Sequence, residues 1–159
     1  VKLYLEESPI TAGNFKKLVE EGFYNETKFH RVIADFMIQG GDPLSKNDNL
    51  RKRWGTGGAE RIKDEFIRGL SNKRGTLSMA NSGPNSGSSQ FFINTVNNDF
   101  LDWDKAPMNS KHPVFGEIIA GMDVIDNISI IKTQRGDMPV KDIKISSAFM
   151  ETPKSPPKK

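Results

Sequence analysis

The sequence contains no cysteine, so neither a disulfide bond nor a cysteine-ligated zinc ion can stabilise the fold. The 159 residues must be held together by their own core, and this length fits one domain. Hydrophobic residues make up 35% and charged residues 27%, as expected for a globular protein. A cysteine-free chain suits the reducing cytoplasm, and we predict a cytoplasmic location. The chain starts without Met, so a removed N-terminal targeting segment is left open.

The sequence also lacks a run of 18 apolar residues, and we therefore expect no transmembrane helix and no membrane partner. A dense basic stripe interleaved with aromatics is missing as well, which argues against nucleic acid as a ligand. The net charge is only +3. Three lysines lie in the tail 153–159, and a second basic cluster, Arg51–Arg53, precedes Trp54. We expect a monomer that binds neither nucleic acid nor membrane.

Motifs for common enzyme chemistries are missing too. The chain has two histidines and no G-x-S-x-G elbow, which leaves little for a hydrolase triad. No Walker lysine or dinucleotide-binding glycine pattern is present. These absences direct attention to chemistry that needs no nucleophile, metal ion or cofactor.

Apolar residues follow the spacing of short strands and of two helices. Ser8 and Pro9 predict the start of the first helix, and Gly22 predicts its end. Met122, Ile125 and Ile128 have the spacing of a second, shorter helix. Strands are predicted within 1–5, 29–33, 36–39, 76–80, 90–94, 114–119 and 143–145. A polar surface loop is predicted at 42–61, and a solvated Pro/Lys tail at 151–159.

Several short strands, two helices and no alternating strand–helix rhythm favour an antiparallel barrel or sandwich. The fold class is therefore mostly β, with two capping helices. We place the domain at residues 1–150.

Three segments, 29–42, 78–93 and 111–116, carry polar groups where a simple strand would show plain alternation. His30 and Arg31 are consecutive on a predicted strand, so their side chains point to opposite faces. Met37 and Gln39 share a face by the same spacing. Of the neighbours Phe91 and Phe92, one should be core, and we assign Phe91 to it.

These segments closely resemble the cyclophilin signature, in the same order along the chain, over residues 1–148. The runs Phe-His-Arg-Val-Ile at 29–33 and Gly-Ser-Ser-Gln-Phe-Phe-Ile at 87–93 carry most of the resemblance. It implies a closed eight-stranded antiparallel barrel with an α-helix at each end and a groove on its outer face. The implied activity is that of a peptidyl-prolyl cis-trans isomerase that assists protein folding without a cofactor. The chain is most similar to compact, single-domain prokaryotic members.

The resemblance also assigns roles by position, with Arg31 as the catalytic residue. It implies a proline pocket, residues that hold the peptide backbone, and a groove wall. The pocket residues are Phe36, Met37, Phe92 and Leu101; the backbone-binding residues are Gln39, Asn81, Gln90 and His112; Ala80 and Ser82 form the wall. His30 is included because it adjoins Arg31, although we favour a structural histidine over a catalytic one.

Phe100 matches a position that is Trp in many eukaryotic cyclophilins. A phenyl ring lacks the indole N–H donor, so the resemblance implies weaker binding of cyclosporin. Proline-containing peptides and proteins are the expected partners.

An arginine suits this reaction for a physical reason. Amide resonance gives an X-Pro bond a rotation barrier of about 18–20 kcal/mol. In the twisted transition state the prolyl nitrogen regains a lone pair, to which the permanently protonated guanidinium of Arg31 can donate a hydrogen bond. The planar amide offers no such acceptor, so the interaction is selective for the transition state.

Two stretches look longer than the compact prokaryotic pattern. Leu44–Trp54 separates Asp42-Pro43 from the glycine-rich run that starts at Gly55, and Trp103–Ser110 precedes Lys111 and His112. The second insertion either extends the substrate site or enlarges a loop, and we favour the loop. Two other functions stay open: a docking module for proline peptides, and a scaffold recruited through Arg51–Arg53.

Overall fold

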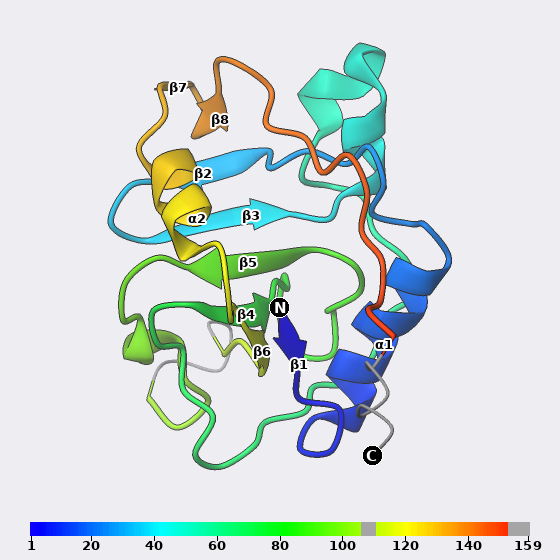
Figure 1. The fold of residues 1–159 in the computed structure, drawn as a ribbon, viewed down its shortest axis with the longest axis vertical. Helices are drawn as coiled ribbons and strands as arrows, with labels where there is room; N and C mark the ends of the chain where they lie inside the picture. The colour runs from blue at the N-terminus through cyan, green and yellow to red at the C-terminus, as the bar shows by residue number, and fades with distance from the viewer. Residues whose placement is uncertain (106–110, 153–159) are drawn as a thin grey trace, which may run out of the picture.

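A computed structural model describes residues 1–105 and 111–152. Its main element is a six-stranded antiparallel sheet in the order β1-β6-β4-β5-β3-β2 (Figure 1). The strands are β1 (Lys2–Leu3), β2 (Arg31–Ile33), β3 (Met37–Gly40), β4 (Thr76–Met79), β5 (Phe91–Asn94) and β6 (Val114–Glu117). They coincide with six of the seven strands predicted from alternation, although most are shorter.

The two helices are α1 (Pro9–Glu20) and α2 (Met122–Ser129), close to the predicted bounds. In Figure 1, α1 lies at the right of the strands and α2 at the left, where it contacts β2 and β3. Both helices pack into one core with one face of the sheet. That core contains Ala12, Leu18, Val19, Tyr24, Phe29, Val32, Ile38, Leu77, Met79, Phe91, Ile93 and Phe115, with Ile125 and Ile128 packed against it.

The first helix begins at Ser8 and Pro9 as predicted, but Ser8 does not cap it. A carboxylate 57 residues away takes that role: Glu65 accepts hydrogen bonds from the Ile10 and Thr11 amides at 3.1 and 3.0 Å. Ser8 Oγ donates to the same carboxylate at 2.8 Å. Negative charge is favourable at a helix N-terminus, where amide groups lack partners within the helix. The loop that carries Glu65 is thereby fixed to α1.

The helix ends where Gly22 predicts. Gly22 has φ +71°, its N–H donates to the Val19 carbonyl, and the Phe23 N–H donates to the Leu18 carbonyl. This is the Schellman arrangement, which favours glycine because the left-handed conformation is unstrained without a Cβ.

We expected a closed barrel of eight strands. The structure instead shows an open sheet of six strands. The remaining strands, β7 (Thr133–Gln134) and β8 (Met138–Pro139), pair only with each other. Pro139 has no N–H to donate, which limits a longer ladder there.

The predicted strand at 143–145 is also replaced by a looser connection. Its backbone meets the segment before β2 through the single bridge Lys28↔Lys144 and separate hydrogen bonds, such as Phe29 N–H to the Ile143 carbonyl at 2.9 Å. Segment 143–145 therefore lies beside residues 27–29 without adding a strand to the sheet.

The segment predicted as a plain surface loop at 42–61 contains two 3₁₀ helices, η1 (Pro43–Lys46) and η2 (Asp48–Arg53). A third, η3 (Asp99–Leu101), follows β5. Trp54 is buried after η2, with Lys28 Nζ 4.7 Å and the Arg51 guanidinium carbon 4.6 Å from its ring centroid. The first insertion is therefore an ordered part of the fold, because cations over an indole face are attracted to it.

None of the helices in the described residues has the length and apolar character to cross a membrane. Most of the predicted tail, residues 153–159, lies outside the described residues.

Candidate active site

The residues expected to act together lie in one row across the outer face of the sheet. Arg31 on β2 is directly opposite Gln39 on β3, and Gln39 is opposite Phe92 on β5. Side chains alternate along a strand, so Met37 shares the face of Gln39 while Ile38 points into the core. The pairing register therefore brings segments 29–42 and 78–93 to one surface.

A cavity of about 220 Å³ opens on this face. Its floor is an apolar cluster of Met37, Phe92 and Leu101, each at most 6% exposed. The lining residues are Arg31, Phe36, Met37, Gln39, Ala80, Asn81, Phe92, Leu101 and His112. Nine of the thirteen residues expected at the site thus line a single cavity, with an apolar floor and polar groups around it.

Arg31 is exposed and lines the cavity. Nη1 donates a hydrogen bond to Gln39 Oε1 at 3.3 Å. This contact uses one of the five N–H groups of the guanidinium. The side chain is therefore positioned by a neutral partner that leaves its charge uncompensated.

His112 lies against the cavity with its imidazole edge on to Phe92, at a centroid distance of 5.3 Å. Nδ1 is 3.0 Å from the Met79 carbonyl oxygen, which can only accept, so Nδ1 carries the proton. Nε2 is then an acceptor. Burial lowers the pKa of His112, which keeps the ring neutral near pH 7.

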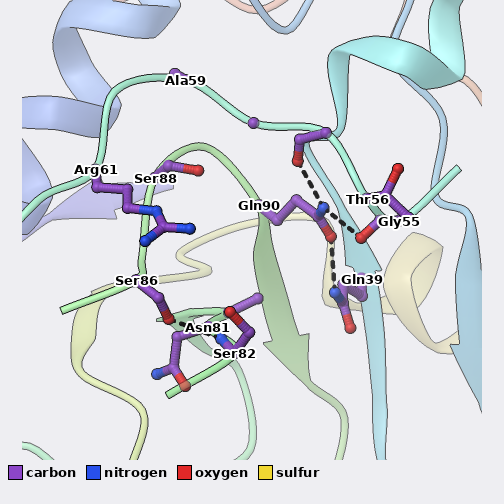
Figure 2. A pocket seen from close by; sticks show the side chains of 13 residues that line it. Gln39, Gly55, Thr56, Ala59, Arg61, Asn81, Ser82, Ser86, Ser88 and Gln90 are labelled. Carbon is purple, nitrogen blue, oxygen red and sulfur yellow. Dashed lines mark hydrogen bonds between the residues drawn. The ribbon is translucent and has the colours of Figure 1, made fainter. Parts of the chain in front are cut away.

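A second cavity of about 390 Å³ adjoins the first, and the two share Gln39, Ala80 and Asn81. Figure 2 shows the side chains that line this second cavity. Its walls come from the glycine-rich run after η2 and from the turn before β5. The additional lining residues are Gly55, Thr56, Gly57, Gly58, Ala59, Arg61, Ser82, Ser86, Ser88 and Gln90. Ser82 and Gln90 were expected at the site and lie here. The other eight were missed, although both segments stood out in the sequence as rich in glycine and polar residues.

The amide of Gln90 is engaged on both sides (Figure 2). Its Nε2 donates to the carbonyl oxygens of Gly55 and Gly57 at 2.9 and 2.8 Å. Its Oε1 accepts a hydrogen bond from Gln39 Nε2 at 3.0 Å. Gln90 therefore links the glycine-rich run to the row of residues that contains Arg31.

Two of the expected site residues line neither cavity. His30 is buried, its ring lies close to Gly55, and burial lowers its pKa. Phe100 is 54% exposed, and its ring stacks on Phe36 at a centroid distance of 6.0 Å. Within the second insertion, Trp103 is partly exposed, while residues 106–110, including Pro107, lie outside the described residues.

Comparisons with known proteins identify the family of the chain. The family model described as cyclophilin type peptidyl-prolyl cis-trans isomerase matches residues 1–149. A peptidyl-prolyl cis-trans isomerase of Acinetobacter baylyi is 41% identical and aligns with 97% of this chain and 82% of its own length. The isomerase-like 1 protein of Aspergillus fumigatus is 41% identical over 93% of this chain and 86% of its own. The CYP71 isomerase of Arabidopsis thaliana is 45% identical over 91% of this chain, which spans only 21% of that longer protein.

Among solved structures, a cyclophilin type isomerase of Cryptosporidium parvum, crystallised in the presence of the dipeptide Ala-Pro, superimposes with a TM-score of 0.81. It is 28% identical, and the match covers 95% of this chain and 90% of that one. By sequence and by fold, the chain belongs to the cyclophilin-type peptidyl-prolyl cis-trans isomerase family.

Proposed function

We propose that this chain accelerates cis-trans rotation about X-Pro peptide bonds in protein substrates, with Arg31 as the catalytic residue. The observation that carries the proposal is the placement of Arg31 in the lining of an apolar-floored cavity of about 220 Å³. The proline ring of the substrate occupies the floor formed by Met37, Phe92 and Leu101. Phe36 and Ala80 pack against the same cluster and complete the walls.

The energetic demand fits a hydrogen-bonding mechanism. The uncatalysed barrier is about 18–20 kcal/mol, and each factor of ten in rate requires about 1.4 kcal/mol. When the bond twists, the prolyl nitrogen becomes pyramidal and gains a lone pair that Arg31 can bind. That interaction is weak in the planar ground state, so it lowers the barrier. Burial of the proline ring supplies binding without opposing rotation of the preceding carbonyl.

Three polar side chains around the cavity hold the flanking peptide backbone. Asn81 Nδ2 donates to the Lys111 carbonyl at 2.7 Å, and a primary amide has a second N–H for a peptide oxygen. His112 offers Nε2 as an acceptor, and Gln39 lies next to Arg31. Ser82 extends this polar wall into the second cavity.

Phe100 leads us to expect weak binding of cyclosporin. Its half-exposed ring lies beside Phe36, and it has no N–H. A Phe100→Trp variant adds one donor, and a neutral hydrogen bond is worth about 0.5–1.5 kcal/mol. We expect cyclosporin to bind this variant several-fold more tightly by calorimetry; equal or weaker binding would refute the assignment. A monomeric state and a cytoplasmic location stay predictions.

The central experiment measures cis-trans exchange of a short X-Pro peptide by NMR with the wild type, Arg31→Ala and the control Arg135→Ala. Arg135 is exposed in the β7–β8 hairpin and lines neither cavity. We expect acceleration by the wild type and the control, and at least a hundredfold loss in Arg31→Ala. A module that only docks peptides would bind without accelerating exchange, and full activity of Arg31→Ala would exclude the proposed mechanism.

A recruitment role for Arg51–Arg53 is less favoured. Arg51 Nη2 donates to Asp142 Oδ1 at 2.8 Å, and its guanidinium covers Trp54. These contacts assign Arg51 to holding the first insertion in place.

A further inference from the structure

A chain of hydrogen bonds with a fixed direction leads to Arg31. It starts at the carbonyl oxygens of Gly55 and Gly57, which accept both hydrogens of Gln90 Nε2. Carbonyls only accept, so the NH₂ group of Gln90 must face them and its Oε1 must face Gln39. Oε1 in turn accepts from Gln39 Nε2, which leaves Gln39 Oε1 toward Arg31.

A side-chain amide has two orientations, which differ by exchange of its oxygen and its NH₂ group. Each hydrogen bond in this series excludes one of the two orientations for the next residue. Without Gln90, Gln39 would be free to rotate by 180° and present its NH₂ group to the guanidinium. Two donors would then face each other, and the contact with Arg31 would be lost. The orientation of Gln39 is therefore fixed from two sides, by Oε1 of Gln90 and by the guanidinium, which can only donate.

A buried carboxylate fixes Gly55 and Gly57, where this series of hydrogen bonds begins. Asp42 has no exposed surface, and its Oδ2 accepts hydrogen bonds from the Gly55 and Gly57 amides. Its Oδ1 accepts from the Leu44 amide at 2.8 Å. Hydrogen bonds to a charged group are the stronger ones, so both glycine carbonyls are held where Gln90 needs them. At Gly57 an added Cβ would overlap Asp42, which explains why this approach requires glycine.

We propose that Gln90 is a positioning residue for Arg31, acting through Gln39, and that the Asp42-anchored run Gly55–Gly57 sets its orientation. Because both of its N–H groups are committed within the protein, Gln90 is not available as a donor to the peptide, and it contributes to turnover through Gln39. The inference rests on the proposed function, since it requires Arg31 to be the catalytic residue. It assigns the glycine-rich run a task in catalysis beyond forming a wall of the second cavity.

The test is a double-mutant cycle with Gln90→Ala and Arg31→Ala, using NMR exchange of an X-Pro peptide at raised enzyme concentration. We expect Gln90→Ala to lower kcat about five- to tenfold and to leave KM within about twofold. In the Arg31→Ala background, the same change should alter kcat by less than about twofold. Gln134→Ala, on β7 and outside both cavities, is the control and should behave as wild type in either background.

Other outcomes decide against the inference. If Gln90 binds the peptide itself, KM rises in Gln90→Ala and the effects of the two variants add. If Gln90 only stabilises the fold, its variant loses thermal stability while kcat per folded molecule is unchanged. If Arg31→Ala alone retains full activity, the proposed function fails, which is distinguishable from an additive cycle around an essential Arg31.

A second variant probes the anchor independently. Asp42→Asn keeps only one oxygen, so either the Leu44 amide or the two glycine amides lose their acceptor, and the charge that strengthens these hydrogen bonds is removed. We expect the same fall in kcat as for Gln90→Ala, and no further fall when both changes are combined. If the combined effect on kcat equals the product of the two separate effects, Asp42 and Gln90 act independently. That result would overturn the role of Asp42 in orienting Gln90.

Discussion

Arg31 and Gln39 are directly opposite each other on antiparallel strands, and their side chains meet at 3.3 Å between Nη1 and Oε1. A cation thus faces a neutral acceptor where a carboxylate would also fit. Opposite charges on such a cross-strand pair attract and would occupy the guanidinium. The neutral partner keeps Arg31 available to a substrate.

Replacing Gln39 by Glu tests this relationship. We expect kcat/KM for an X-Pro peptide to fall about tenfold in Gln39→Glu, because a carboxylate competes with the substrate for the guanidinium. Surface ion pairs are screened by salt, so 0.5 M NaCl should restore part of the loss. Gln134→Glu is the matched control and should be unaffected at both salt concentrations. A loss in Gln39→Glu that salt does not change would contradict competition by charge.

Phe91 and Phe92 offer a comparison of the two faces of the sheet. Both are 4% exposed, but Phe91 packs in the main core while Phe92 belongs to the cavity floor. Changing either to Leu removes buried area and should lower the free energy of unfolding by about 1–3 kcal/mol in urea titrations. Only Phe92→Leu should also weaken peptide binding, by about threefold or more. Equal effects on binding would mean that the cavity floor is not the proline site.

Glu65 should matter for stability and not for activity. Its carboxylate accepts from two amides at the start of α1 and from Ser8 Oγ. Loss of a helix cap costs about 0.5–2 kcal/mol, and we expect Glu65→Ala to fall in this range by urea unfolding. Glu60→Ala, at an exposed position on the same segment, should cost much less. Isomerase activity at 25 °C should be unchanged in both; a selective loss in Glu65→Ala would show that α1 affects the groove.

Stability should decrease as the pH falls below about 6.5. Burial lowers the pKa of both His30 and His112 from their ordinary value of 6.5. The unfolded chain therefore binds protons at a higher pH than the folded one, and the free energy of unfolding is fully retained only above pH 6.5. Each histidine contributes a slope of at most about 1.4 kcal/mol per pH unit, which ends once the pH passes its folded pKa.

Urea titrations at pH 7.5, 6.5 and 5.5 measure this slope. His30→Asn should be less sensitive to pH than the wild type between 6.5 and 5.5, whatever its stability at pH 7.5. An unchanged slope in His30→Asn would mean that His30 is not held neutral in the fold.

Much of the fold could be predicted because its signals are local. Alternation located β2, β3, β4 and β5, and Pro9 with Gly22 marked both ends of α1. The failures involve distant partners. Nothing around 143–145 reveals that its backbone meets residues 27–29 through separate hydrogen bonds, and the capping role of Glu65 depends on a side chain 57 residues from Ser8.

The site shows the same division. Residue type and spacing alone do not mark Arg31 as catalytic; the order of the three flanking segments does. Members of one strand, such as Met37 and Gln39, were assigned to one face correctly because alternation requires it. The hydrogen bonds of Gln90 were not foreseeable, since they go to backbone carbonyls 33 and 35 residues away, which carry no signal in the side-chain sequence.

The carboxylate of Asp42 has a consequence for the first insertion. It binds the backbone where the insertion begins, at Leu44, and again directly after it ends, at Gly55. The segment thus leaves and re-enters the fold at one point, and the entropy of closing a loop grows only slowly with its length, by about 0.6 kcal/mol per doubling. Residues can therefore be added within η2 without displacing the groove, which makes this position suitable for carrying a reporter or an additional binding segment.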